Sequence, residues 1–179
     1  MSFPRLQFYQ MAKYKKLPSL KRIKELVSYE PESGKLFWLQ PVARWIRVGE
    51  KAGTYCKHAV DITLDKVTYR AHRIIWFLVT EKDPGNMMID HIDGNPHNNK
   101  FENLRIATSR QNQCNQKIRR DNTSGLKGVS WSEERQKWQT GIQVNGKRVG
   151  LGRFNTKEEA YEAYCKAAKE LHGEFARLN

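Results

Sequence analysis

The sequence contains no long apolar run. No stretch approaches the roughly 20 apolar residues that a membrane-spanning helix needs, and no apolar signal core follows the first residues. No basic helix with a dominant apolar face is evident either, which argues against binding to a membrane surface. We therefore expect a protein that stays in the cytosol of the cell that makes it and has no membrane partner.

Cysteine is scarce. The three residues Cys56, Cys114 and Cys165 are odd in number, lie far apart and form no C-x-x-C pair. This pattern argues against a disulfide framework and against a zinc-stabilised structural protein. We interpret all three as structural thiols.

Acidic residues are few relative to basic ones. The 179 residues include 32 Lys and Arg but 19 Asp and Glu, which gives a net charge of +13. A basic excess of this size attracts polyanions, and each neutralised phosphate of a nucleic acid releases counterions. Charge alone is equally compatible with scattered lysines on a basic protein. The length suits one ordinary domain or two small ones.

The N-terminal half shows alternating helix and strand signals. Residues 1–18 form a basic, aromatic arm, and Ser19 can cap a helix with apolar residues spaced at three and four. Residues 35–40 are β-rich, and strand-like runs follow from residue 55. The apolar run 71–79 fits a helix or a strand by periodicity alone, and we favour a helix.

The residues suited to chemistry lie between positions 87 and 115. A short apolar strand leads directly into Asp90 and His91, and a loop rich in turn formers follows. A helix capped at position 108 or 109 then carries Asn112. In a β-β-α arrangement, the loop would bring the carboxylate, the imidazole and the amide to one pocket. Each residue taken alone also suits an ordinary turn.

These side chains fit the hydrolysis of a phosphodiester. A neutral imidazole accepts a proton near neutral pH, so His91 is the candidate general base. Asp90 and the side-chain oxygen of Asn112 are hard ligands for one Mg²⁺ or Mn²⁺ ion, which would stabilise the departing 3′ oxygen and the phosphate charge. If the helix starts late, Asn115 or Gln116 would take the place of Asn112.

The same segment resembles the HNH endonuclease family. It carries the run Ile89-Asp90-His91-Ile92-Asp93-Gly94-Asn95, then Asn98-Asn99, Glu102-Asn103-Leu104-Arg105, Thr108 and Asn112. The spacing is closest to the phage and intron-homing branch, whose last motif residue is Asn, and the run 69–76 also looks like the segment that precedes the motif. The resemblance implies a ββα-metal nuclease module and a role for Asn103 in holding the loop so that His91 is correctly oriented.

The C-terminal third has a different pattern. Short strands are expected at about 128–131, 138–144 and 148–154, with an Asn145-Gly146 hairpin between the last two. Thr156 and Glu159 form a capping box for a helix with a stripe of small residues. We expect a three-stranded antiparallel sheet packed on one helix, which makes the whole chain an α+β protein.

Strand alternation predicts two different faces for this sheet. The face toward the helix would hold Val129, Trp131, Trp138, Ile142, Val149 and Leu151. The outer face is polar and cationic, and such a sheet can enter the major groove of DNA. The predicted DNA-binding residues are Lys127, Ser130, Arg135, Lys137, Gln139, Gln143, Lys147, Arg148 and Arg153, with Arg119 and Arg120 in the preceding segment.

This part resembles the APETALA2-type DNA-binding domain. The supporting residues are Lys127-Gly128-Val129, Lys137-Trp138, Ile142, Leu151-Gly152-x-Phe154, Thr156-x-Glu158-Glu159-Ala160, Ala163-Tyr164, Ala167-Ala168 and His172-Gly173. Plant members carry Arg and Trp on the reading face where this chain has Ser130, Gln143 and Gly150. The resemblance therefore implies DNA contact without a base preference.

The sequence thus predicts a nuclease domain at 19–116, a basic linker at 117–124 and a DNA-binding domain at 125–179. The expected function is a phage-type homing endonuclease that nicks double-stranded DNA with one divalent ion and no small-molecule cofactor. A homodimer would be needed to cut both strands. The alternatives are a DNA-binding regulator that has lost catalysis and a protein that binds or processes RNA.

Overall fold

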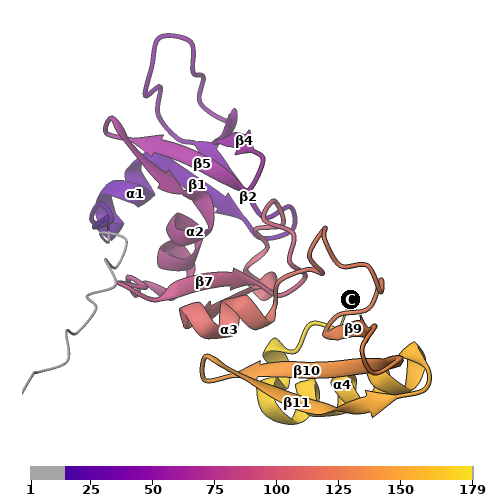
Figure 1. Cartoon of the computed structure of the whole chain (residues 1–179). Helices are drawn as coiled ribbons and strands as arrows, with labels where there is room; N and C mark the ends of the chain where they lie inside the picture. Colours follow the sequence, from indigo (N-terminus) through magenta and orange to yellow (C-terminus); the bar gives the residue numbers. More distant parts are fainter. Residues whose placement is uncertain (1–14, 179) are drawn as a thin grey trace, which may run out of the picture. The chain divides into compact units, whose positions relative to one another are not determined.

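The computed structural model describes residues 15–178, which form two compact units, one ending at Ile106 and one beginning at Ala107 (Figure 1). The predicted arm lies largely outside the described residues. Its last part packs on the first unit, because Leu17 is 5% exposed in the core and the Lys15 ammonium donates to the Thr68 carbonyl at 3.0 Å.

Two small sheets and two helices form most of the first unit. Helix α1 (Leu20–Leu26) begins at Ser19, whose hydroxyl accepts from the Arg22 N–H as expected of a cap. One sheet has the order β1-β2-β3 and the other β4-β5-β6. Their strands are β1 (Val27–Glu30), β2 (Lys35–Trp38), β3 (Lys51–Ala52), β4 (Thr54–Cys56), β5 (Ala59–Leu64) and β6 (Val67–Arg70).

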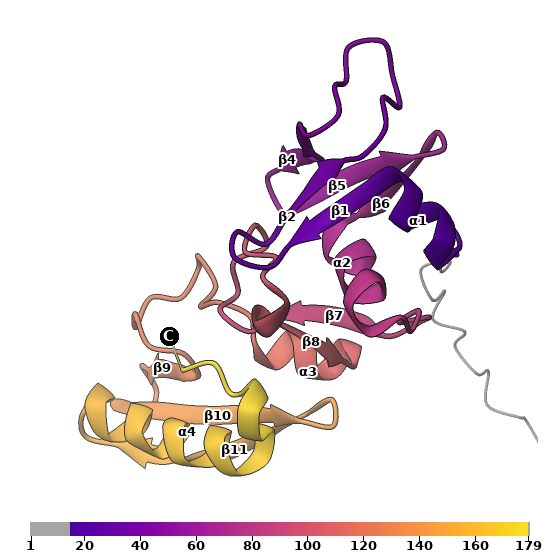
Figure 2. The ribbon, with the colours of Figure 1, turned by 180° about the vertical axis from the view of Figure 1, so that it is seen from behind.

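The ambiguous apolar run is a helix, α2 (Ala71–Thr80). Its residues Ile74 and Ile75 are buried in a core that both sheets and α1 share. Arg73 donates to the carbonyls of Gly85 and Met87, at 2.6 and 2.9 Å, and so fixes the turn before the next strand. Figure 2 shows α2 between the two sheets and the strand pair that follows.

That strand pair consists of β7 (Met88–His91) and β8 (Leu104–Ala107), joined by a loop that ends in a short 3₁₀ turn (Phe101–Asn103). The β7 strand was expected from its apolar residues. Ile89 and Leu104 bury their side chains in the same core as α2. The core therefore anchors the strand that carries Asp90 and His91.

The second unit begins with α3 (Ser109–Cys114), which the sequence had grouped with the nuclease domain. Thr108 caps it through a capping box with Gln111. A sheet of order β11-β10-β9 and helix α4 follow, with a final 3₁₀ turn (Gly173–Phe175). The elements are β9 (Val129–Ser132), β10 (Lys137–Val144), β11 (Lys147–Phe154) and α4 (Lys157–His172).

The predicted sheet-and-helix arrangement is confirmed. Asn145 and Gly146 both adopt positive φ, at 52° and 79°, as a tight hairpin turn requires. The Thr156–Glu159 capping box starts α4. The α+β fold class is therefore correct for both units. None of the helices between residues 15 and 178 is long and apolar enough to cross a membrane.

Helix α4 lies against one face of the sheet through small residues and one tyrosine (Figure 2). Ala160, Tyr164 and Ala168 are buried there. Gly128 has a φ of +78°, and a Cβ atom on it would lie 2.2 Å from the Tyr164 ring. Only glycine fits this position, because a side chain would collide with the ring and strain the backbone.

Two apolar residues expected on the helix face are instead largely exposed. Trp131 is 38% exposed and Val149 is 44% exposed. Both lie on outer strands of the sheet, and Trp131 packs edge-on against Trp138 with ring centres 5.2 Å apart. Strand alternation gives the side of a sheet but not how far the single helix reaches across it.

Candidate active site and nucleic-acid interface

Asp90 is a buried carboxylate in an ion pair. Its side chain lies at the end of β7, and the residue is 5% exposed. Arg105 on β8 donates from Nε and Nη2 to the Asp90 Oδ2 atom, at 2.9 and 2.8 Å. Because a buried charge without compensation is costly, Arg105 stabilises the carboxylate at this position.

His91 is held by a hydrogen bond from its ring. The residue is 8% exposed, and its Nε2 atom lies 2.9 Å from the Asn99 Oδ1 atom. An amide oxygen can only accept, so Nε2 carries the proton in this pair. In the neutral ring the lone pair then lies on Nδ1, which gives Nδ1 the basic character.

Asn99 is itself fixed by the first sheet. It is 3% exposed, and its carbonyl accepts from the Tyr29 hydroxyl at 3.4 Å. The same hydroxyl accepts from the Phe101 N–H at 2.8 Å. The turn after β1 approaches so closely that a Cβ on Gly34 would lie 2.5 Å from the Lys100 nitrogen. The segment 99–101 therefore has little room to move, and the amide that contacts His91 is pre-positioned.

The rest of the loop is closed by Asp93 and Asn103. The Asn103 Oδ1 atom accepts from the Asp93 N–H at 3.0 Å, and its Nδ2 atom donates to Asp93 Oδ1 at 3.0 Å and to the Asn98 carbonyl at 2.8 Å. Burial would raise the pKa of Asp93, but hydrogen bonds from Asn98, the Asn95 N–H and Asn103 outweigh it and lower the pKa below its usual value. Asp93 thus stabilises the turn by accepting hydrogen bonds, while Asn103 links the two ends of the loop.

His72 on α2 lies beside the candidate base. Its ring meets the His91 ring edge-on, with centres 5.1 Å apart. Its buried Nδ1 atom has no hydrogen-bond partner among residues 15–178. Burial, followed by the electrostatic effects of His91, Arg73 and Arg70, lowers the pKa of His72 to about 3. His72 is therefore neutral and packs against the side of the His91 ring.

Among residues 15–178, few side chains of the types that hold a metal ion lie together. Within residues 15–178, no three His, Cys, Asp or Glu side chains are grouped to hold an ion. One carboxylate and one amide oxygen nevertheless suit Mg²⁺, which keeps several waters and binds substrate phosphate. Helix α3 starts at Ser109 and not late, so half-buried Asn112 lies within it, whereas Asn115 is its C-cap. Asp90 and Asn112 belong to different units, so Asn112 as the amide ligand stays a prediction.

The outer face of the second unit's sheet carries rows of polar residues. The register pairs Ser130 with Gln139 and Gln139 with Arg153, so the three form one row across the sheet. Gln143 and Arg148 form another row. A hollow of ≈ 530 Å³ opens here, lined by Gln139, Thr140, Arg148, Gly150, Gly152 and Arg153.

Lys127 has a different role from the predicted one. Its ammonium donates to the carbonyls of Cys114, Gln116 and Arg177, at 2.8, 2.8 and 3.0 Å. These three bonds use all the donors of a lysine. Burial lowers the pKa of Lys127, as expected for a charge withdrawn from water. Lys127 thus binds the chain's own backbone, which leaves its ammonium group no donor for a DNA phosphate.

Sequence reasoning gave no role to Asn99, Arg105 or the packing of His72 on His91. Asn99 and Arg105 both lie within the motif that resembles the HNH family. The motif did not indicate that Asn99 contacts His91 or that Arg105 pairs with Asp90. The residue types were a usable signal, since a buried carboxylate needs a cation and a ring nitrogen needs an acceptor. The pairing itself depends on how the loop closes.

Comparisons with known proteins identify both parts of the chain. A family model described as HNH endonuclease matches residues 69–114, and an AP2 domain model matches residues 124–174. "Protein 3.8" of Escherichia phage T7 is 41% identical over 109 residues, which cover 61% of this chain and 89% of that protein. "Uncharacterized HNH endonuclease L560" of Acanthamoeba polyphaga mimivirus is 33% identical over 137 residues, covering 76% and 71%. No solved structure matches the chain.

Proposed function

Because this chain belongs to the HNH endonuclease family and carries a C-terminal AP2 domain, we propose that it is a homing-type endonuclease that nicks double-stranded DNA. His91 serves as the general base, and a divalent ion assists. The observation that carries this proposal is the bond between the His91 Nε2 atom and the Asn99 amide oxygen. It leaves the basic nitrogen on the other side of the ring.

The base acts on water. In the neutral ring, His91 Nδ1 accepts a proton from the water that attacks the phosphorus atom. The ring then becomes positively charged, and the Asn99 oxygen stabilises this charge through Nε2–H. Neutral His72 packs against the ring and limits its rotation. The result is a base held in one orientation throughout proton transfer.

Asp90 and Asn112 are the proposed ligands of one Mg²⁺ or Mn²⁺ ion. When bound, such an ion supplies positive charge to the scissile phosphate and the departing 3′ oxygen. Arg105 keeps the Asp90 carboxylate in place through its bonds to Oδ2. Asn103 has a positioning role, because it joins the loop ends on either side of Asn99 and so supports the contact with His91.

The outer face of the AP2 sheet is proposed to hold the DNA. Arg148 and Arg153 line the hollow, and Gly150 faces open space there, which would let a phosphate approach the backbone. Such contacts fix the register of the duplex and carry no base preference. The proposed contacts are Ser130, Arg135, Lys137, Gln139, Gln143, Lys147, Arg148 and Arg153, with Arg119 and Arg120.

The test is cleavage of supercoiled plasmid and of phage genomic DNA with and without Mg²⁺. The wild type should convert plasmid to open circles in Mg²⁺ and not in EDTA, and His91→Ala should bind DNA but not cut it. Equal inactivity of both proteins on every DNA, with binding retained, would instead favour the non-catalytic regulator. Full-length linear product whose formation rises with the square of protein concentration would indicate a dimer that cuts both strands.

A matched pair of variants tests the role of Asn99. Asn99→Leu removes the acceptor while keeping the size, and we expect kcat to fall by about 10- to 100-fold with little change in KM. Asn99→Asp keeps an acceptor oxygen and should recover much of the rate. If the leucine and aspartate variants lose equal activity, the bond to His91 does not serve catalysis.

A further inference from the structure

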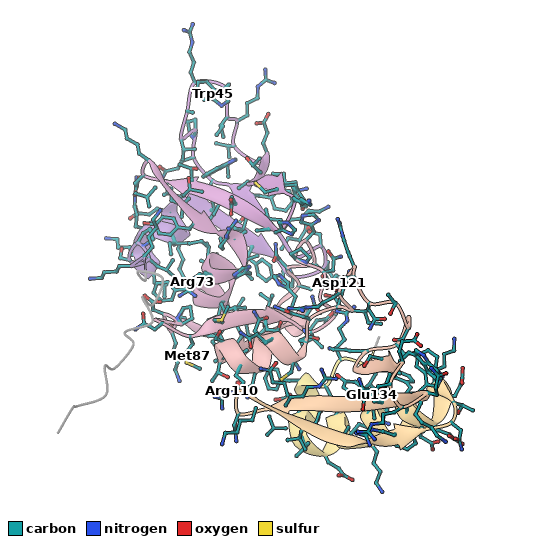
Figure 3. All side chains as sticks on the ribbon, viewed as in Figure 1. Trp45, Arg73, Met87, Arg110, Asp121 and Glu134 are labelled. Carbon is teal, nitrogen blue, oxygen red and sulfur yellow. The ribbon has the colours of Figure 1, made fainter. Side chains whose placement is uncertain are left out.

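An exposed tryptophan lies on the long loop between β2 and β3. Figure 3 shows this loop, residues 39–50, projecting away from the strands of the nuclease unit, with Trp45 near its tip. Trp45 is 81% exposed, and Val48 on the same loop is 61% exposed. Tryptophan is among the residues that are usually well covered in folded proteins. The catalytic residues described above do not involve this loop.

The loop backbone is structured. The Ile46 N–H donates to the Ala43 carbonyl at 3.0 Å, and Glu50 N–H donates to the Arg47 carbonyl at 3.2 Å. The Glu50 carboxylate in turn accepts from the Arg47 N–H at 3.2 Å. Ile46 packs against the hydrophobic core. Because Ile46 points inward, its neighbour Trp45 is presented outward from a fixed turn.

The charges around Trp45 indicate its partner. Arg44 precedes Trp45 directly and Arg47 follows two positions later, and both arginines are exposed. The chain has a net charge of +13, so a second copy would bring like charge against this loop. An exposed aromatic ring with arginines close by in the same loop suits a nucleic acid, where bases offer flat apolar faces and phosphates lie on either side.

We propose that Trp45 is a wedge that stacks on a base of duplex DNA while Arg44 and Arg47 contact the adjacent phosphates. This inference rests on the proposed function, since its ligand is the DNA that the nuclease would cut. Apolar side chains that insert between base steps unstack them and bend the duplex. The nuclease unit would thereby bind DNA through a contact of its own, in addition to the contacts of the AP2 sheet. Base stacking tolerates many sequences, so the contact adds affinity without a strict base preference.

Fluorescence anisotropy with a labelled duplex in EDTA tests the wedge without cleavage. Trp45→Ala should raise the Kd by about 10-fold, within the range known for loss of one base–aromatic stack. Its dependence on salt should not change, because an apolar contact releases no counterions. Trp45→Phe should retain most of the affinity. Arg44→Ala should instead lower the slope of log K against log salt by about 0.9.

Leu171→Ala is the matched control, because Leu171 is a 50% exposed apolar residue on α4. It should bind DNA like the wild type. Unchanged affinity of Trp45→Ala would overturn the wedge, as would a loss of self-association or of vesicle binding without a loss of DNA binding. Plasmid cleavage separates the two proposals. If the wild type cuts plasmid, and Trp45→Ala cuts it equally well with an unchanged Kd, only the wedge is refuted. If the wild type never cuts DNA, but Trp45→Ala binds DNA more weakly than the wild type, only the nuclease proposal is refuted.

Discussion

Replacing His72 with phenylalanine should make the nuclease unit less sensitive to acid. The folded protein holds the pKa of His72 at about 3, whereas an unfolded chain has a histidine pKa near 6.5. Between these values the unfolded state binds more protons, so stability is present above the unfolded pKa and falls as the pH is lowered. From pH 7 to pH 5, this group alone should remove about 2 kcal/mol of unfolding free energy. The electrostatic effects of His91, Arg73 and Arg70 act in the same direction as burial.

Urea unfolding at pH 7 and pH 5 measures this difference. Replacing Trp131 and Trp138 by phenylalanine leaves tryptophan fluorescence only in the first unit, so the signal reports the part that contains His72. The unfolding free energy lost between pH 7 and pH 5 should be about 2 kcal/mol smaller in His72→Phe than in the wild type. His58→Phe replaces an exposed histidine and should leave the loss unchanged. If His72→Phe and the wild type lose equal stability, the burial argument is refuted.

Three further changes test other parts of the structure. Arg105→Ala leaves a buried carboxylate without its cation, so we expect about 3–5 kcal/mol of destabilisation in urea; a loss below about 1 kcal/mol would contradict the pairing. Gly128→Ala should destabilise the second unit by at least about 2 kcal/mol through its clash with Tyr164, whereas Gly146→Ala, with a similar φ and open space, should cost less. Equal losses would show that the ring moves aside. Arg148→Ala should weaken DNA binding and lower its salt slope by about 0.9, and an unaltered slope would mean that no phosphate is bound there.

The elements that could be predicted from sequence are those with local signals. The hairpin at Asn145 follows from residues that tolerate positive φ, and α4 follows from the capping box at Thr156. The run that forms α2 was ambiguous, and burial on several sides decides it. Ile74 and Ile75 are adjacent in sequence and both buried, a pattern that two-residue strand alternation would not give.

The contacts that orient the candidate site could not be predicted, because they join residues through the closed loop. Nothing local to Asn99 distinguishes it from Asn98, yet only the former is placed by Tyr29 and the turn at Gly34 to meet His91. The role of Lys127 was missed for a similar reason. A lysine in a basic segment resembles a phosphate ligand until its carbonyl partners are known.

Those partners make the last residues of the chain part of the folded unit. Lys127 has exchanged its hydration shell for main-chain oxygens, one of them on Arg177, only a few positions from the end. A protein shortened to residue 176 would lack the Arg177 carbonyl. The third N–H of the Lys127 ammonium would then have only water as an acceptor in a partly buried site. The segment after α4 therefore takes part in the packing of the AP2 unit through the Arg177 carbonyl.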